Sequence, residues 1–306
     1  MKAAVCTRYG PPEVLRVEEL ATPAPRKNEV RIRILATTVT SSDGYVRGLN
    51  LGPAYRLMAR LALGWSAPRQ PVLGMVLSGE VDSVGPDATS FEVGDRVFGL
   101  NRHRFGTYAQ YVCWPESGLL ARRPANLTDE EAAAVPYGGL LALHFLRKAG
   151  VRAGQRVLVY GASGAVGTSA VQLARHLGAE VTGVCSTANL DLVASLGATT
   201  VIDYTSEDFT SRAERYDLIF DTVGKRKSAA ALRRGRQALA PGGACVSVDD
   251  GTPSLRREDL ALLGQLATKG QIRPVIDRTF ALDDIVVAHR YVDNGHKRGN
   301  VVITVP

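Results

Sequence analysis

The chain has 306 residues, which suits about two domains and allows a sizeable buried core. Hydrophobic residues make up 45% and charged residues 22%, and no stretch approaches the roughly 18–20 apolar residues of a membrane span. The net charge of +7 would suit a small anionic ligand, whereas the densest basic cluster, 225–236, has no aromatic side chain on which nucleic-acid bases could stack.

The four cysteines, Cys6, Cys113, Cys185 and Cys245, lie far apart in the sequence and form no CxxC pair. This spacing predicts reduced thiols, and it argues against a disulfide framework or a four-cysteine metal site. The first residues lack the apolar core of a signal peptide. We therefore expect a cytoplasmic protein.

Residues 1–122 have the pattern of a small β domain. The segment 30–35 alternates apolar and basic side chains, as a half-buried strand does. Further strands are predicted over 76–84, 96–98 and 108–112, separated by Gly, Pro and Asp. Many short strands with turn residues between them favour a barrel-like β domain.

The segment 53–65 between two of these strands predicts an amphipathic helix. Met58, Leu61 and Trp65 share one face, and Arg56 and Arg60 share another. Three interpretations stay open: an apolar lid over a lipophilic substrate, a helix packed on the β domain, and a helix that contacts a membrane surface.

Residues 123–270 alternate strands with helices, which predicts a doubly wound parallel sheet. The predicted elements are strands over 157–160, 180–185, 201–202, 218–220 and 244–248 and helices over 168–177 and 190–196. The tail, 271–306, predicts a strand, a helix and a strand over 272–275, 284–292 and 300–305. We expect the tail to fold back onto the first domain.

The strongest local motif is Gly161-Ala-Ser-Gly-Ala-Val-Gly167, which follows an apolar strand and opens a helix. Glycines let the backbone turn sharply and approach a pyrophosphate, and the helix presents free N–H groups to the phosphates. The motif therefore predicts a dinucleotide site. Its candidate contacts are Ser163, Gly164, Ala165 and Val166.

The end of the second strand of this domain bears on the choice of cofactor. NAD-binding proteins usually place an acid there for the ribose 2′-hydroxyl, but this chain has Cys185 and Ser186. Ser186, Thr187 and Asn189 can donate hydrogen bonds to a 2′-phosphate, although 180–200 contains no Arg or Lys. The pattern favours NADPH over NADH.

Motifs along essentially the whole chain resemble one family. They are the segments 1–5 and 42–48 (Ser-Asp-Gly-Tyr-Val-Arg-Gly), 93–97, 106–111, 161–167, 217–224, 241–243 and 295–299. Together they resemble the zinc-free quinone oxidoreductase branch of the medium-chain dehydrogenase/reductase superfamily. The resemblance implies an α/β protein with a GroES-like β-barrel catalytic domain (1–122 and 271–306) and a Rossmann doubly wound NADP-binding domain (123–270). The active site would lie in a cleft between them.

The resemblance also bears on metal and assembly. Zinc-dependent relatives need a Cys ligand and a Gly-His-Glu segment, but 37–43 and 74–76 contain neither Cys nor His, so we expect no zinc. The segment 247–260 is short where relatives carry a strand that pairs across a dimer, so a homodimer and a monomer both stay open. Four positions depart from the branch pattern: Thr40, Leu141, Asn189 and Asn300.

Without zinc to polarise an alcohol, an electron-poor acceptor such as a quinone or an enone is the favoured substrate, with hydride supplied by the cofactor. Tyr45 is the candidate hydrogen-bond donor or positioner, and Thr40 and Trp65 join it on the substrate side. Asp43 is expected to orient nearby backbone, and Arg47 to lie at the surface or to contact a phosphate. The further cofactor candidates are Tyr204, Val223, Gly224, Val248 and Asp249.

Two other functions are weighed against this one. The departures from the branch pattern leave open a non-catalytic NADP(H)-binding sensor or partner-binding protein. The basic cluster suggests nucleic-acid binding as the other function, and the lack of aromatic side chains in that cluster argues against it. NADPH consumption with a panel of quinones separates the reductase from the sensor.

Overall fold

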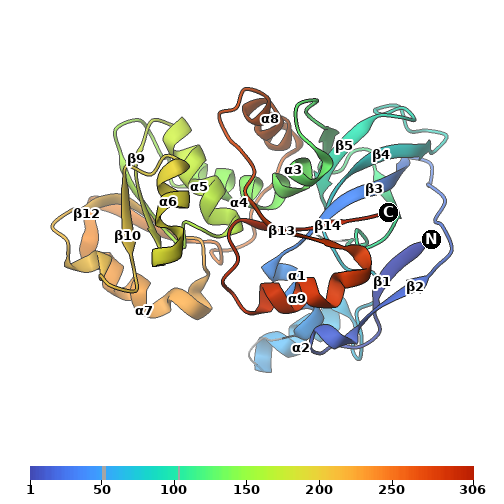
Figure 1. The fold of residues 1–306 in the computed structure, drawn as a ribbon, viewed down its shortest axis with the longest axis horizontal. Helices are drawn as coiled ribbons and strands as arrows, with labels where there is room; N and C mark the ends of the chain where they lie inside the picture. The colour runs from blue at the N-terminus through green and yellow to red at the C-terminus, as the bar shows by residue number, and fades with distance from the viewer. Residues whose placement is uncertain (50–52, 103) are drawn as a thin grey trace. The chain divides into compact units, whose positions relative to one another are not determined.

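The computed structural model describes residues 1–49, 53–102 and 104–306, and its chain forms two compact units (Figure 1). The first unit joins 1–136 to 276–306, and the second is 137–275. Among the described residues, no helix is long and apolar enough to cross a membrane. All four cysteines are free.

A seven-stranded sheet forms the centre of the first unit, in the order β13-β14-β3-β4-β5-β7 with β6 also paired to β3. Its strands are β3 (Glu29–Val39), β4 (Val76–Val84), β5 (Arg96–Leu100), β6 (Tyr111–Pro115), β7 (Leu120–Arg122), β13 (Ile276–Ala281) and β14 (Asn300–Thr304). A separate antiparallel pair is made by β1 (Lys2–Cys6) and β2 (Leu15–Glu19). Strand β14 pairs antiparallel with β3, so the tail completes this sheet as expected.

The two faces of strand β3 explain why apolar and basic side chains alternate in its sequence. Val30, Ile32 and Ile34 are fully buried, and the two arginines between them lie on the other face. There Arg31 and Arg33 form ion pairs with Asp82 and Glu80 of the neighbouring strand β4. Opposite charges on adjacent strands stabilise the pairing, so one strand serves both the core and the surface.

The helices of the first unit are α1 (Ser41–Gly48), α2 (Pro53–Leu63), α3 (Asp129–Ala134) and α9 (Ile285–Asp293), with short 3₁₀ turns at Pro12–Val14 and Leu282–Asp284. Helix α3 contacts β3, β4 and β14. It therefore belongs to this unit, and the unit boundary lies later in the chain than the predicted break after residue 122.

Two predicted strands differ from the structure. The segment predicted over 108–112 becomes a strand only at Tyr111, because Tyr108 and Ala109 bond to β1 instead. The strand predicted over 272–275 is wrong, and β13 begins at Ile276. The Gln172 side chain bonds both the N–H and the C=O of Arg273, so the backbone there is satisfied without a neighbouring strand.

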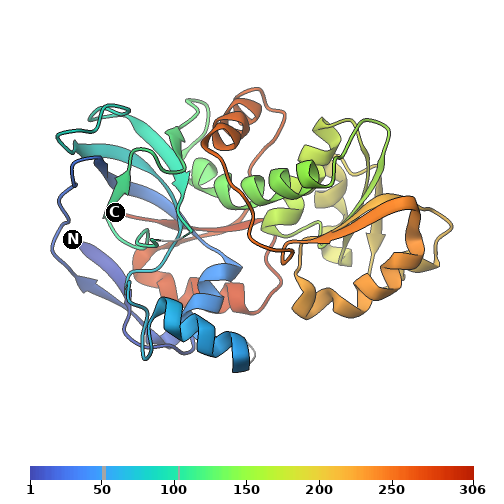
Figure 2. The ribbon, with the colours of Figure 1, turned by 180° about the vertical axis from the view of Figure 1, so that it is seen from behind.

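The second unit is built on a five-stranded parallel sheet, in the order β10-β9-β8-β11-β12 (Figures 1 and 2). The strands are β8 (Arg156–Tyr160), β9 (Glu180–Cys185), β10 (Thr200–Asp203), β11 (Tyr216–Asp221) and β12 (Leu239–Ser247). The helices are α4 (Pro136–Lys148), α5 (Ala165–His176), α6 (Leu190–Ser195), α7 (Lys225–Gly235) and α8 (Arg257–Thr268), with 3₁₀ turns at Thr187–Asn189, Phe209–Ser211 and Arg236–Ala238.

The order of these strands reverses direction at β8. The chain steps from β8 to β9 and β10 on one side, and from β11 to β12 on the other. Because crossovers between parallel strands are right-handed, α5 and α6 cover one face of the sheet and α7 covers the opposite face. Such a reversal leaves a ligand crevice at the carboxyl ends of the strands, which is where the predicted cofactor residues lie.

Candidate functional site

The glycine motif forms a tight turn between β8 and α5. Gly161 has a φ of 83°, and its N–H and that of Ala162 donate to the carbonyl of Val184. A Cβ on Gly167 would lie 2.1 Å from the carbonyl oxygen of Gly161, so only glycine allows the helix to start this close to the strand. The N-cap residue of α5, Gly164, supplies no side-chain cap. The first turn of α5 therefore has N–H groups that a phosphate can accept from.

A neutral polar cluster lies beside this turn, at the end of β9. Asn189 is buried, and its amide nitrogen donates to Ser163 Oγ at 3.2 Å and to Ser186 Oγ at 3.0 Å. The other amide atom, Oδ1, is buried without a hydrogen-bond partner. An unsatisfied buried polar atom is costly, so this cluster is a place where a polar ligand would complete the bonding.

Asp203, at the end of β10, is a carboxylate that bonds to Thr187, the residue after Ser186. It accepts hydrogen bonds from the hydroxyls of Thr187 and Thr205 and from the Thr205 N–H. These bonds, that from Thr187 first, lower the pKa of Asp203. The carboxylate is thus used in joining the segments that follow β9 and β10.

Asp221, the fully buried last residue of β11, holds the other half of the sheet edge together. One of its carboxylate oxygens accepts from the N–H groups of Val223 and Gly224, at 3.0 and 3.2 Å. The other accepts from the hydroxyls of Ser228, at 2.8 Å, and Ser247, at 2.7 Å. One carboxylate therefore fixes the turn after β11, the start of α7 and the end of β12.

The residues after β12 are tied to the same edge. The Val248 N–H donates to the carbonyl of Asp221, and Asp249 accepts from the Lys225 N–H at 2.7 Å. Gly224 has a φ of 96°, and a Cβ there would lie 2.9 Å from the Asp249 carboxylate. The structure thus brings the predicted cofactor residues of this domain to one edge of one sheet. Their contacts with a cofactor stay predictions.

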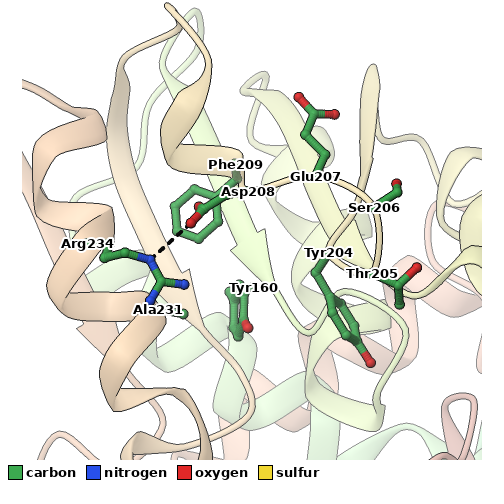
Figure 3. A pocket seen from close by; sticks show the side chains of 9 residues that line it. All are labelled: Tyr160, Tyr204, Thr205, Ser206, Glu207, Asp208, Phe209, Ala231 and Arg234. Carbon is green, nitrogen blue, oxygen red and sulfur yellow. Dashed lines mark hydrogen bonds and ion pairs between the residues drawn. The ribbon is translucent and has the colours of Figure 1, made fainter.

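A cavity of about 320 Å³ opens beside this edge, on the α7 side of the sheet (Figure 3). Tyr160, the last residue of β8, stands between Arg234 of α7 and Tyr204, which follows β10. Arg234 forms an ion pair with Asp208 at 3.0 Å across one end of the cavity. The remaining lining residues are Thr205, Ser206, Glu207, Phe209 and Ala231.

In the first unit, α1 carries the predicted substrate-side residues. Thr40 caps this helix: its hydroxyl and its N–H donate to Asp43 at 2.7 and 2.8 Å, and the hydroxyl accepts from the Asp43 N–H. Both residues are buried, and burial raises the pKa of Asp43 to about 6. Asp43 thus orients backbone, as expected, and the Thr40 hydroxyl is already engaged in the cap.

The other two substrate-side candidates are exposed. Tyr45 of α1 is 37% exposed. Trp65, just beyond α2, is 62% exposed, and the Arg60 guanidinium lies 5.8 Å from the centroid of its ring. Whether either residue contacts a substrate stays a prediction.

Two family descriptions match the chain: alcohol dehydrogenase GroES-like domain over residues 26–124, and zinc-binding dehydrogenase over residues 165–277. The 2-methylene-furan-3-one reductase of Solanum lycopersicum is 32% identical over 99% of this chain and 79% of its own length. The mouse (Mus musculus) protein named NAD(P)H oxidoreductase RTN4IP1, mitochondrial, is 32% identical over 100% of this chain and 89% of its own. The chain belongs to the medium-chain dehydrogenase/reductase superfamily.

Solved structures of this oxidoreductase superfamily agree with that assignment. The quinone oxidoreductase from Coxiella burnetii is 28% identical, with a TM-score of 0.85 over 100% of this chain and 99% of its own. The fold class predicted from the sequence, a GroES-like domain with a Rossmann domain, is confirmed.

The glycine turn between β8 and α5 lies where the sequence predicts it. The sequence did not predict the cavity, whose walls include Tyr160, Phe209 and Arg234. Tyr160 directly precedes Gly161, so its place at the carboxyl end of β8 was a usable signal. Phe209 and Arg234 belong to segments that only the folded chain brings together.

One expectation for the first unit is wrong. Arg47 is neither at the surface nor a free phosphate contact, because it is 1% exposed. Its guanidinium donates to the Gly10 carbonyl and to Asp293 and contacts His289 Nδ1 at 3.1 Å. Burial, and then the charge of Arg47, lower the pKa of His289 to about 3, so this histidine is neutral. The network fastens α1 to α9.

The described residues, 1–49, 53–102 and 104–306, contain no group of three or more His, Cys, Asp or Glu that could hold a metal ion. At the positions where zinc-dependent members carry ligands, the only carboxylate is Asp43, which is bonded to Thr40. His144 is half-buried on α4 and contacts the Ser254 carbonyl at 3.1 Å.

Proposed function

We propose that the protein is an NADPH-dependent, zinc-independent oxidoreductase that transfers hydride to a quinone or an α,β-unsaturated carbonyl compound. The observation that carries the proposal is the neutral cluster of Ser163, Ser186 and Asn189 beside an uncapped helix N-terminus. The names of the relatives point the same way, since they include an enone reductase and a quinone oxidoreductase.

The residues present fit the cofactor. The N-terminus of α5 would hold the pyrophosphate, and the cluster at the end of β9 would meet the adenosine ribose. The Asn189 N–H₂ donates to both serine oxygens, which leaves the two serine hydroxyl hydrogens to donate to a 2′-phosphate, and no carboxylate stands at Ser186 to repel it. The cavity beside Tyr160 and Tyr204 offers aromatic walls for the adenine.

The residues present do not fit a catalytic zinc. A zinc site uses about three His, Cys or carboxylate ligands, whereas Thr37, Thr38 and Thr40 supply hydroxyls at the positions concerned. Both Thr37 and Thr40 also have hydrogen-bond partners in the protein. We therefore route no step of the reaction through a metal.

Bound NADPH supplies the hydride, and the protein positions the acceptor and stabilises the negative charge that develops on its oxygen. We assign the donor to Tyr45, whose side chain on α1 is 37% exposed. The capping box of Thr40 and Asp43 and the buried Arg47 fix this helix, and so they orient the phenol ring. Positioning by such a rigid helix reduces the entropy lost in reaching the transition state.

The test follows the oxidation of NADPH, and of NADH in parallel, with a panel of quinones, enones and aldehydes after exhaustive chelation. We expect turnover with the first two classes, at least about tenfold preference for NADPH, and no loss on chelation. Tyr45→Phe should lower kcat about 100-fold and leave cofactor affinity unchanged. Cofactor binding without turnover would favour the sensor, and activity that needs added zinc would contradict the proposal.

We also propose a cytoplasmic location and a small lipophilic substrate as the principal partner. The mouse relative is named as mitochondrial, so cell fractionation is the deciding experiment. The edge position of β12, and the lack of any helix or strand between Ser247 and Arg257, are compatible with a monomer or a homodimer. Light scattering at several protein concentrations distinguishes these two states.

A further inference from the structure

The outer side of α2 and the turn after it carries an unusual group of exposed apolar side chains. Leu57, Met58, Leu61 and Trp65 are 52%, 66%, 61% and 62% exposed, and they lie within nine residues of each other. We call these four side chains the α2 face. Their exposure shows that this face is not packed on the β domain, and packing of the helix there through another side stays open. Grouped exposed apolar side chains of this size mark an interaction surface.

Hydrogen bonds at the end of the helix hold the α2 face in place. The helix is followed by Gly64, whose φ of 130° suits glycine alone, and a Cβ there would meet the Ala67 carbonyl at 2.1 Å. The Tyr9 hydroxyl donates to the Gly64 carbonyl at 2.8 Å. The Arg69 guanidinium donates to the last-turn carbonyl of Leu61 at 3.0 Å. The outward direction of Trp65 is therefore built into the fold.

The charges within the segment that carries the α2 face all have one sign. The sequence contains no Asp or Glu between residues 44 and 79, whereas Arg56, Arg60 and Arg69 lie on or next to the helix. Arg56 and Arg69 are exposed, and Arg60 lies over the Trp65 ring. An apolar strip with an indole and a cationic border has the composition of helices that lie in the interface of a membrane.

The charge pattern decides between two occupants. If two copies of the chain met through this face, a twofold interface would bring the same arginine border of each copy together, and the like charges would repel. A lipid surface with anionic headgroups instead attracts every one of these cations and accepts the apolar side chains between its headgroups.

We propose that the α2 face docks on an anionic lipid surface, with Leu57, Met58, Leu61 and Trp65 inserted at the headgroup level and the arginines bound to lipid phosphates. The proposal goes beyond the reductase function and does not depend on it, since it concerns attachment and no step of the reaction. The protein would then be a peripheral membrane protein, with access to lipophilic molecules dissolved in the bilayer.

The chain contains its own probe. It has two tryptophans, and Trp114 is 1% exposed whereas Trp65 is 62% exposed. The full-length protein is mixed with vesicles of phosphatidylcholine alone, or with vesicles in which about a third of the lipid is phosphatidylglycerol. We expect a blue shift of the tryptophan emission, quenching by brominated lipid and co-sedimentation with the anionic vesicles only. Trp65→Phe should abolish the shift and the quenching.

The double variant Met58→Ser, Leu61→Ser should weaken partition into anionic vesicles by about tenfold or more, because it removes two of the four inserted apolar side chains. The matched control is Val287→Ser, which removes a 48% exposed apolar side chain from α9. Both variants should keep the far-ultraviolet circular dichroism of the parent. Added salt should weaken binding of the parent, since the arginine contacts are screened.

Three outcomes would overturn the proposal. The first is no sedimentation with anionic vesicles by a protein that is folded by circular dichroism. The second is equal loss of vesicle binding in the α9 control, which would make the attachment unspecific. The third is self-association that the double variant abolishes while the parent ignores vesicles, which would assign the α2 face to a second copy of the chain.

Discussion

Replacing Asp221 tests the account of the sheet edge, because one buried carboxylate there accepts four hydrogen bonds. In Asp221→Ala the N–H groups of Val223 and Gly224 and the hydroxyl of Ser247 lose their acceptor. The Ser228 hydroxyl keeps the Gly224 carbonyl at 3.0 Å as an alternative. Each orphaned buried donor costs about 1–3 kcal/mol, and removing the buried charge returns part of this, so we expect a net loss of about 3 kcal/mol.

The conservative variant Asp221→Asn separates bonding from charge. Its amide oxygen still accepts from the two backbone N–H groups, and its N–H₂ can donate to the two serine hydroxyls, so we expect a loss of only about 1 kcal/mol. Urea unfolding followed by circular dichroism measures both values, and cofactor binding is followed by nicotinamide fluorescence. Only the alanine variant should also lose cofactor affinity. Equal damage in the two variants, or an alanine variant as stable as the parent, would refute the reasoning.

Three further predictions concern other groups. Ser186→Asp should lower kcat/KM for NADPH by about 100-fold and spare NADH, because the new carboxylate repels a 2′-phosphate; parallel kinetics with both cofactors check this. Gly167→Ala should weaken cofactor binding strongly, since its Cβ would lie 2.1 Å from the Gly161 carbonyl oxygen, and calorimetric titration measures the change. The pKa of His289 is lowered to about 3 and that of Asp43 is raised to about 6, both chiefly by burial. An unfolded chain returns these values to about 6.5 and about 3.9. His289 thus costs stability as pH falls from about 6.5 to about 3, and Asp43 costs stability as pH rises from about 4 to about 6. In urea unfolding at a series of pH values, His289→Gln should remove the first slope and Asp43→Asn the second; a profile that neither variant changes would contradict both assignments.

The sequence predicts the second unit well because its signals are local. The strand over 180–185 matches β9, and the glycine motif and the helix after it lie within one turn-and-helix unit. A strand that is buried on both faces is a short apolar run bounded by turn residues, and such runs are easily located. The prediction of a strand over 272–275 failed because the Gln172 side chain bonds the backbone N–H and C=O of Arg273. Gln172 is about 100 residues away in the sequence, so no local pattern reveals this contact.

The candidate site likewise contains residues that local signals locate and residues that only distant contacts place. Its cofactor residues follow strand ends, so the topology of a parallel sheet gathers them on one edge. Arg47 shows the opposite case: its sequence neighbours suggest an exposed helix end, yet it is buried against His289 and Asp293. A charge becomes buried only when distant partners compensate for its lost hydration, and the sequence pattern around the charge carries no sign of them.

The same physics explains why α2 stands apart from the other helices. Periodicity predicts a face of apolar side chains on this helix, but periodicity does not tell which side of a helix faces the protein. In a typical surface helix the apolar stripe is buried, and in α2 Met58 and Leu61 point outward while Arg60 lies against Trp65. A single exposed apolar side chain is ordinary on a protein surface, whereas a contiguous group of them marks a surface that another molecule or phase covers. The vesicle experiment therefore tests whether the α2 face is covered by a lipid bilayer or by a second copy of the chain.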